Sequence, residues 1–544
     1  MSNITLKEKR LGVKDLVQSN IGLISVVGMF YAICCAGAYG IEEMIPEAGP
    51  GVTILLLLIL PLIWALPYSN ICAELGSARP VEGGSIMWVK EALGEFWFAI
   101  MVFTNVIWAL VCNSVYVVLS VNYLGNIVEL TDAQAYIIKL LMVLIFFIIN
   151  VVGLKEVSVV STVLSILIIL VFAFVAIVGF ANWNFSPIEP FMSEEYDGLL
   201  GAIGAGIAIG VWMYSGFDEI SLMAGEIRDA RKVIPKALMI VVPLISLTYL
   251  LPTIGGLATV GNWESWTTEP GGVGYATVLT QNLSPVFGII FMIVAILGQL
   301  SIFNVCIATG GRCILILSDQ NFGPKFLARL TRKKGTPYVG LVIVAIVTAL
   351  LIPFDFTFLV LVEVFFMVTV VALTTIAAMI LKRRIPKEEV PFQTPGGKVG
   401  HTIMAVVIIA ICVFTILSNG TDWFLGGLLW ILAVPLLYLI FKRLYKGSTV
   451  MEPELYPINP KTKLGFGDLQ RIGKTYVGIG LFSTFSRFFL GWYEGEWGHE
   501  YYLEEYEEGL FSNFDLMLKV ILIVGIATII AGLVFYMAGK KIEK

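Results

Sequence analysis

The stretch "CCAGAYGIEEMIPEAGPG", residues 34–51, places two adjacent acidic residues directly after a run of small residues. The chain around it is apolar, and a carboxylate at membrane depth costs roughly 2.5–3.5 kcal/mol on insertion scales. Glu42 and Glu43 therefore indicate a functional site, in which they bind an amine or form a gate. In the alternative, they and Glu47 lie beyond the break, in water at an outer vestibule, where they cost almost nothing.

A second stretch, "GVWMYSGFDEISLMAGE" at residues 210–226, repeats the combination of glycine with paired acids. Ser215 and Gly216 interrupt the expected helix here. Asp218 follows on the interrupted helix itself, and we predict that it belongs to the site. Glu219 points elsewhere on such a helix, and we predict it as a gating or coupling residue.

The composition shows what kind of element must hold these residues. Of 544 residues, 58% are hydrophobic and only 14% are charged, which is more apolar surface than one soluble core can hide. Apolar runs long enough for the roughly 20 residues of a spanning helix recur along almost the whole chain. We therefore expect an all-α polytopic membrane protein.

The apolar runs predict twelve core membrane segments, the first and sixth of which are interrupted. Basic clusters fall on every second loop, so the positive-inside rule places these loops and the N-terminus in the cytoplasm. The expected segments are 15–47, 52–76, 96–124, 133–153, 157–181, 199–227, 236–258, 283–318, 338–353, 355–381, 402–418 and 423–441. The basic clusters are Lys7–Arg10, Arg228–Lys236, Lys325–Lys334, Lys382–Lys387 and Lys442–Lys446.

The C-terminal extension contains one or two further membrane helices. The range 475–492 is apolar but short and carries Arg487, which also suits an interfacial helix. We favour a spanning segment, and fourteen helices in all, because the terminal lysines then lie inside. The expected division of the chain is a cytoplasmic N-terminus (1–14), a first repeat (15–181), a second repeat (199–381), two helices (400–442), a cytoplasmic linker (443–474) and the extension (475–544).

The two interrupted segments open successive blocks of five helices. Matching interrupted helices in two halves of a chain favour a transporter built from inverted repeats, with its binding site between the breaks. Backbone groups in lipid must be hydrogen-bonded, so an unwound stretch survives only where protein or a watery cavity receives it. Freed N–H groups there hold a carboxylate, while freed carbonyls and acidic side chains hold an ammonium group.

Two loop motifs on the expected cytoplasmic side narrow the class. The stretch "ELGSARPVEGGSIMWV" (74–89) follows the second helix, and "AGEIRDARKVIPKAL" (224–238) follows the interrupted sixth. Over about 20–445 the chain resembles the amino acid-polyamine-organocation transporter superfamily, on these motifs together with "GRCILILSDQNFGPKFLARLTRKKGTPY" (311–338) and "PFQTPGGK" (391–398). The stretches "AGAYGIEEMIPEAGPG" and "FDEISLMAGEI" resemble the branch of polyamine permeases and bacterial amino acid permeases.

The resemblance implies a five-plus-five inverted-repeat core of the LeuT type that works by alternating access. It places Trp212 as an aromatic gate over the substrate and Asn113 as a polar contact from the third helix. Each has a structural alternative, as a packing residue for Trp212 and as an interhelical hydrogen bond for Asn113. The predicted substrate-binding residues are Ala36, Gly37, Ala38, Tyr39, Gly40, Glu42, Asn113, Trp212, Ser215, Gly216 and Asp218. The predicted gating or coupling residues are Glu43, Tyr214, Glu219, Glu226 and Glu74, of which the last two sit at helix ends beside Arg79, Arg228, Arg231 and Lys232 as conformational ion-pair residues.

Two departures from the family pattern bear on substrate and coupling. Polyamine permeases of this type tend to have an acidic residue where this chain has Cys112. The fifth helix lacks the lysine that some proton-coupled amino acid permeases carry there. Titration of Asp218 or Glu42 is the alternative route for a coupling proton, and Na⁺ coupling or exchange without net ion movement is equally open.

The sequence therefore predicts a secondary transporter, a symporter or exchanger, of amino acids or related amines across the cell membrane. A polyamine permease of the same fold is the first alternative, and a channel or a non-transporting amino acid sensor is the next. We expect no enzyme activity, no cofactor and no metal site, because the two histidines, His401 and His499, have no nucleophile, base or metal ligand at a suitable spacing. The expected partners are a small-molecule substrate and the bilayer, without nucleic acid.

Overall fold

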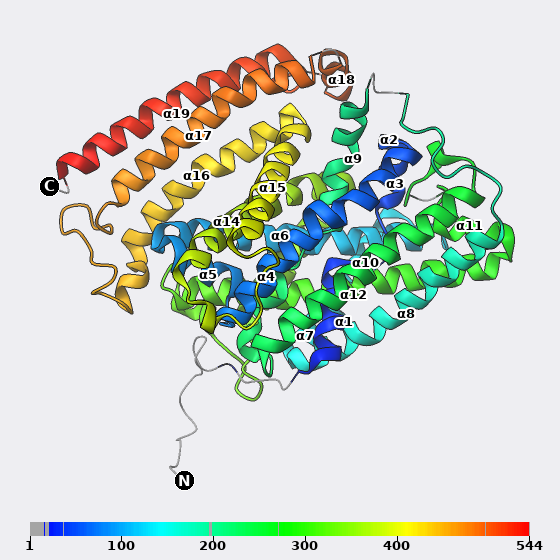
Figure 1. Ribbon diagram of the computed structural model, residues 1–544, viewed down its shortest axis with the longest axis horizontal. Helices are drawn as coiled ribbons and strands as arrows, with labels where there is room; N and C mark the ends of the chain where they lie inside the picture. The colour runs from blue at the N-terminus through cyan, green and yellow to red at the C-terminus, as the bar shows by residue number, and fades with distance from the viewer. Residues whose placement is uncertain are drawn as a thin grey trace, which may run out of the picture.

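The structure of the chain is a computed structural model, shown as a ribbon in Figure 1. It describes residues 16, 21–35, 37–194, 198–269, 271–495, 497–506 and 508–542. Within these ranges nearly all regular structure is helical, and ten helices are long and apolar enough to cross a membrane. The predicted N-terminal segment 1–14 lies outside the described residues. The chain is an integral membrane protein of the predicted all-α class.

The first repeat begins with an interrupted helix, as predicted. The break separates α1 from α2 after Cys34, and a π-helical turn at Pro61–Ala65 joins α3 to α4. Gly84–Leu93 forms a helix, α5, that the apolar pattern did not predict. The helices are α1 (Leu23–Cys34), α2 (Ile41–Ala48), α3 (Pro50–Leu60), α4 (Leu66–Ala78), α5 (Gly84–Leu93), α6 (Glu95–Gly125), α7 (Asp132–Val152) and α8 (Leu154–Ala181).

The second repeat begins with the other interrupted helix. Between α9 and α10 the chain forms only two short 3₁₀ turns, Glu219–Leu222 and Ala224–Glu226. The predicted interruption of segment 199–227 is present, but no α-helix resumes after it within that segment. The helices are α9 (Leu199–Met213), α10 (Ala230–Thr259), α11 (Tyr275–Asn282), α12 (Pro285–Asp319), α13 (Tyr338–Leu351) and α14 (Phe356–Arg384).

The interrupted helices of the two repeats pack against each other near the centre of the bundle. Helix α2 lies along α9, and α1 lies against the Glu219–Leu222 turn, so each half of one interrupted helix meets a half of the other. The long helices α8, α10 and α12 pack against α1 (Figure 1). This arrangement brings the two breaks together.

The C-terminal part adds two helices to the core and then a hairpin. Helix α17 runs beside α19 at one side of the bundle (Figure 1). A Cβ atom at Gly473 would lie 2.6 Å from the Gly532 carbonyl, and one at Gly480 would lie 2.5 Å from the Gly525 carbonyl, so glycine permits this close approach. The helices are α15 (Gly397–Ser418), α16 (Thr421–Tyr445), α17 (Asp468–Tyr493), α18 (Gly498–Glu505) and α19 (Phe514–Ile542).

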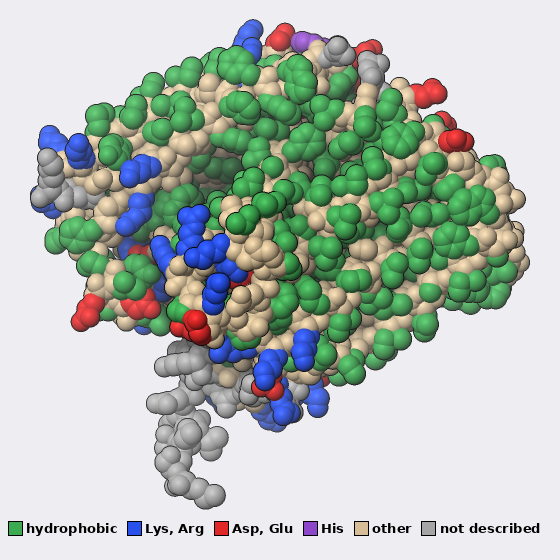
Figure 2. Space-filling model, in the orientation of Figure 1, with side chains coloured by type: hydrophobic (Ala, Val, Ile, Leu, Met, Phe, Trp, Pro, Cys, Tyr) green, Lys and Arg blue, Asp and Glu red, His purple; other side chains and the backbone are tan. Residues whose placement is uncertain are grey.

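The surface has the pattern of a protein that lipid surrounds. Figure 2 shows hydrophobic side chains over the middle of the visible face, with Lys and Arg gathered toward one end and Asp and Glu at the opposite end as well as among the basic residues. Helices α7, α8 and α19 expose large apolar residues such as Leu144, Leu170 and Ile523. We call the end that carries Lys382–Lys387 and Lys442–Lys446 the basic face.

Candidate functional site

The break in the first interrupted helix is built on glycine. Gly37 and Gly40 have φ of 116° and 89°, a region that residues with a Cβ atom rarely adopt. The Gly40 N–H donates to the Glu42 carboxyl group at 3.3 Å, which places this side chain at the N-terminus of α2. Residues 35 and 37–40 therefore lie outside any helix, as predicted. Ala36 lies outside the described residues.

The second break touches the first. Gly216 has φ of 88°, and a Cβ atom there would lie 3.3 Å from the Ile33 carbonyl oxygen at the end of α1. The Tyr249 hydroxyl lies 3.0 Å from the Cys34 carbonyl and 2.8 Å from the Met213 carbonyl. One hydroxyl from α10 thus serves the last carbonyls of both α1 and α9, which the breaks leave without helical partners.

A small cavity of 30 Å³ lies at the second break, and Ile33 near the end of α1 also lines it. Two carboxylates face it, Glu219 from the second break and Glu363 from α14, and the described lining contains neither Lys nor Arg. The Trp108 indole N–H donates to Glu363 at 3.2 Å. The lining residues are Ile33, Trp108, Ala109, Cys112, Tyr116, Trp212, Ser215, Gly216, Glu219, Cys306, Thr309, Glu363 and Met367.

Aromatic side chains close the cavity toward the face opposite the basic one. Trp212 stacks on Tyr116 with ring centroids 6.2 Å apart and meets Phe356 edge-on at 6.0 Å. Beyond them, the loop before α11 is held down by Glu43, which accepts hydrogen bonds from the Thr268 N–H at 2.8 Å and from its hydroxyl at 2.6 Å. The cavity is thus covered by these aromatic rings, and the loop before α11, which hydrogen bonds to Glu43 hold in place, lies beyond them.

The structure brings some of the predicted site residues to this cavity and places others elsewhere. The cavity is lined by Trp212, Ser215, Gly216 and Glu219. Gly40 lies against the Trp212 ring, because a Cβ atom at Gly40 would be 3.1 Å from that ring. The remaining predicted residues at the first break, Gly37, Ala38 and Tyr39, are not among the lining residues.

Three of the predicted polar residues form hydrogen bonds with other groups of the protein and do not line the cavity. Glu42 is buried rather than in water, and it accepts the Tyr123 hydroxyl at 3.3 Å. The Asn113 amide donates to the Ala109 carbonyl at 2.5 Å and the Cys306 carbonyl at 3.5 Å, which is the interhelical alternative for this residue. The Tyr214 hydroxyl donates to the Leu57 carbonyl at 3.2 Å.

Asp218 lies away from the cavity lining, against the turn that follows the second break. Both of its carboxylate oxygens are buried and have no hydrogen-bond partner among the described residues. The hydroxyls of Tyr68 and Ser85 lie near it and also lack a partner there. Three unpaired buried polar side chains therefore meet at one point between α4, α5 and the Glu219–Leu222 turn.

Sequence reasoning missed Glu363, the second carboxylate of the cavity. It is the single acidic residue within the apolar run "FTFLVLVEVFFMVTV" at 356–370. An isolated acid inside a membrane segment is by itself a pointer to a functional site. Glu363 could therefore have been found from the sequence. Tyr116, Cys306 and Thr309 could not, because nothing in their sequence context distinguishes them from other residues of membrane helices.

Buried ion pairs close the basic face. Arg312 of α12 donates to Glu226 at 2.6 Å and lies 3.5 Å from Glu82, and all three side chains are buried. Glu74 pairs with Lys382 at 2.5 Å. Glu74 and Glu226 therefore form ion pairs, as predicted, but their partners come from α14 and α12 rather than from the adjacent basic residues.

Comparisons with known proteins agree on a class. A family model described as amino acid permease matches residues 21–441. A probable polyamine transporter of Arabidopsis thaliana is 25% identical over 404 residues, covering 73% of this chain and 79% of the relative. The polyamine transporter PUT1 of Oryza sativa subsp. japonica is 26% identical over 400 residues, covering 71% of each chain.

Solved structures show the same fold. A crystal structure of MhsT in complex with L-phenylalanine matches with a TM-score of 0.52 and 13% identity, over 74% of this chain and 99% of that one. A mutant of the Eremococcus coleocola manganese transporter matches with a TM-score of 0.54 and 14% identity, over 79% of this chain and 98% of that one.

Proposed function

Because this chain belongs to the amino acid permease family and is a membrane transporter, we propose that it carries a di- or polyamine through the cavity at its second break. The observation that carries the proposal is the charge of that cavity. Glu219 and Glu363 face it without any lining Lys or Arg. A buried carboxylate is costly in its ionised form unless a cation pairs with it, and a solute with two ammonium groups pairs with both acids.

The aromatic lining supports the same cargo. Trp108, Tyr116 and Trp212 surround the two acids. The face of an aromatic ring attracts an ammonium group, and its apolar surface covers the methylene chain between two such groups. The relatives named as polyamine transporters also support this solute class.

A cationic amino acid is the second candidate, and a different observation favours it. At the second break, Ser215 and Gly216 lie outside any helix and line the cavity. Their backbone N–H groups offer a carboxylate the kind of site that unwound helices provide in transporters of inverted repeats. Arginine or lysine would then place its side-chain ammonium or guanidinium group at the acids.

Uptake into proteoliposomes by the purified full-length protein tests the cargo. We expect saturable uptake of labelled putrescine that unlabelled spermidine inhibits, with weaker competition from arginine and none from leucine. Glu219→Gln and Glu363→Gln should each lower the apparent affinity for putrescine roughly 30-fold or more, because each leaves an ammonium group unpaired. The exposed Glu129 provides a control, Glu129→Gln, that leaves uptake unchanged. Leucine transport without putrescine transport would overturn the proposal.

We also propose a proton as the coupling ion, with Asp218 as its carrier. An ionised carboxylate buried without a partner is costly, so Asp218 is stable in this closed state with a proton bound. Na⁺ is the alternative, because the three unpaired oxygen-bearing side chains are the kind that bind hard cations. Asp218→Asn should abolish acceleration of uptake by a pH gradient. Acceleration by a Na⁺ gradient alone would favour the alternative.

We propose that the basic face lies in the cytoplasm and that the protein resides in the plasma membrane. The gathering of Lys and Arg at one end of the molecule supports this orientation. Helix α17 is 26 residues long and lies beside the apolar α19, which supports a second spanning helix in the extension. Cysteines introduced at the exposed Lys461 and Glu129 should react with an impermeant maleimide only from inside and only from outside, respectively.

A further inference from the structure

A second and larger cavity lies between the transporter core and α17. Its volume is 530 Å³, within the roughly 300–1,000 Å³ of small-molecule sites. Its walls come from α6, α14, α15, α16 and α17, and they are mainly apolar, with Trp97, Phe365 and Phe424 among the aromatic residues. Figure 2 shows the visible face hollowed beside the α17–α19 hairpin, so this crevice opens toward lipid.

The wall that α17 contributes has charge at one end and hydrocarbon at the other. Phe482 lies eleven positions after Arg471, which is at the start of the helix, and this spacing spans roughly 16 Å of α-helix. That length is about half of a bilayer core of roughly 30 Å, so the crevice has the depth of one leaflet. The α17 residues that line it follow one helical face: Arg471, Lys474, Thr475, Gly478, Ile479 and Phe482.

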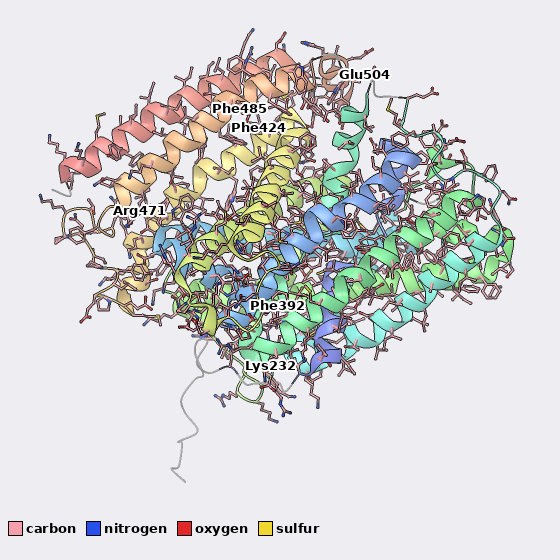
Figure 3. The ribbon with its side chains drawn as sticks, viewed as in Figure 1. Lys232, Phe392, Phe424, Arg471, Phe485 and Glu504 are labelled. Carbon is pink, nitrogen blue, oxygen red and sulfur yellow. The ribbon has the colours of Figure 1, made fainter. Side chains whose placement is uncertain are left out.

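The basic residues at the mouth retain donors for an anion. Arg471 is half-exposed, and its Nη1 donates to Asp468 at 2.7 Å and to the Phe466 carbonyl at 3.0 Å, while Nε and Nη2 make no bond among the described residues. The Lys474 ammonium lies 5.9 Å from the centre of the Tyr536 ring and has no carboxylate within ion-pair distance in the described part of the chain. Figure 3 shows Arg471 near the end of α17 that faces the basic side chains, with Phe424 far from it on α16.

We propose that the crevice binds one anionic phospholipid from the leaflet at the basic face. Its phosphate lies between Arg471 and Lys474, within reach of the Thr475 hydroxyl. One acyl chain follows the apolar walls toward Phe482. Charge complementarity selects this occupant, because the lining contains two cations and no acid, and the depth of the crevice matches one acyl chain. This lipid site is separate from the cavity that carries the solute, and its occupant does not depend on which solute is carried.

Native mass spectrometry of the full-length protein in detergent tests this proposal with dioleoylphosphatidylglycerol and dioleoylphosphatidylcholine as probes. We expect the anionic lipid to bind more tightly, by about fivefold for each basic side chain near the surface. Lys474→Gln should remove about fivefold of the preference without breaking an ion pair, and Arg471→Gln with Lys474→Gln should remove all of it. The exposed Lys461, which does not line the crevice, gives the matched control Lys461→Gln.

A second variant tests the acyl-chain site separately. A Cβ atom at Gly478 would meet nothing within 4 Å, so Gly478→Phe places a ring in the crevice without a backbone clash. It should reduce retention of both lipids at least tenfold. Gly426 on α16 is also open and does not line the crevice, so Gly426→Phe is the matched control.

Three results would overturn the proposal. The first is equal retention of the two lipids by the wild-type protein. The second is unchanged retention by Gly478→Phe when the melting temperature shows that the variant is folded. The third is complete displacement of the anionic lipid by glycerol 3-phosphate at equal concentration, since the site would then bind a free organic phosphate.

Discussion

Removal of Arg312 should open the cavity toward the basic face. The side chain is 2% exposed and lies between the carboxylates of Glu226 and Glu82. Arg312→Met leaves both acids buried without a cation, and removal of one partner of a buried pair costs roughly 3–5 kcal/mol. In an open conformation water can hydrate the acids, so the cost falls mainly on the closed one. At 3 kcal/mol the ratio of open to closed molecules rises about 150-fold.

Two native cysteines report that change. Cys112 and Cys306 line the cavity and are buried, with their sulfur atoms 3.6 Å apart. The rate at which an impermeant maleimide alkylates them from the basic face, followed by peptide mass spectrometry, measures opening. We expect the rate to rise by about two orders of magnitude in Arg312→Met. Arg79→Met is the control, because Arg79 forms only partly exposed ion pairs, with Glu91 and Glu389, worth about 0–1 kcal/mol each.

A compensated variant separates opening from unfolding. Combining Arg312→Met with Glu226→Gln and Glu82→Gln removes the unpaired charges, so alkylation should return toward the wild-type rate. If the single variant keeps its melting temperature and its cysteines stay as unreactive as in wild type, the ion pairs do not close this face. The same conclusion follows if the compensated variant reacts as fast as the single one.

Three further changes test other parts of the structure. Gly216→Ala should lower uptake at least tenfold in the liposome assay, because φ of 88° strains any residue with a Cβ atom; uptake at the wild-type rate would contradict the role of this break. Tyr249→Phe should lower the free energy of unfolding by roughly 1–3 kcal/mol, and with it the melting temperature, because two carbonyls lose their donor. An unchanged melting temperature would show that this hydroxyl does not stabilise the two helix ends. Burial raises the pKa of Glu494, just beyond α17, to about 7, above its unfolded value, so its contribution to stability is present below about pH 4.5 and is lost as the pH rises through 7. Glu494→Gln should therefore weaken the fall in melting temperature between pH 5 and 7, whereas Glu500→Gln, at an exposed position, should not.

The fold could be predicted from the sequence because lipid imposes simple rules. Long apolar runs must be helices, and the small residues around Gly37, directly before paired acids, indicated a break that protein encloses. Helix α5 could not be found in this way, because it is short and sits at the membrane edge. Helix α18 was missed because its sequence is acidic and polar.

The site was predicted in part, for a geometric reason. Spacing along a regular helix favoured Asp218 over Glu219 as the site residue, but the chain forms a 3₁₀ turn from Glu219 onward. Such a turn has about 3.0 residues rather than 3.6, so the side-chain directions differ from those of an α-helix. Glu363 enters the cavity from α14, and its distance in sequence from both breaks conceals the contact.

The shared hydroxyl of Tyr249 has a consequence for an unloaded carrier. A single proton cannot follow two carbonyls that separate, so any rocking that moves α1 from α9 leaves one oxygen without its donor. We therefore expect the empty protein to favour the closed conformation and to reorient slowly.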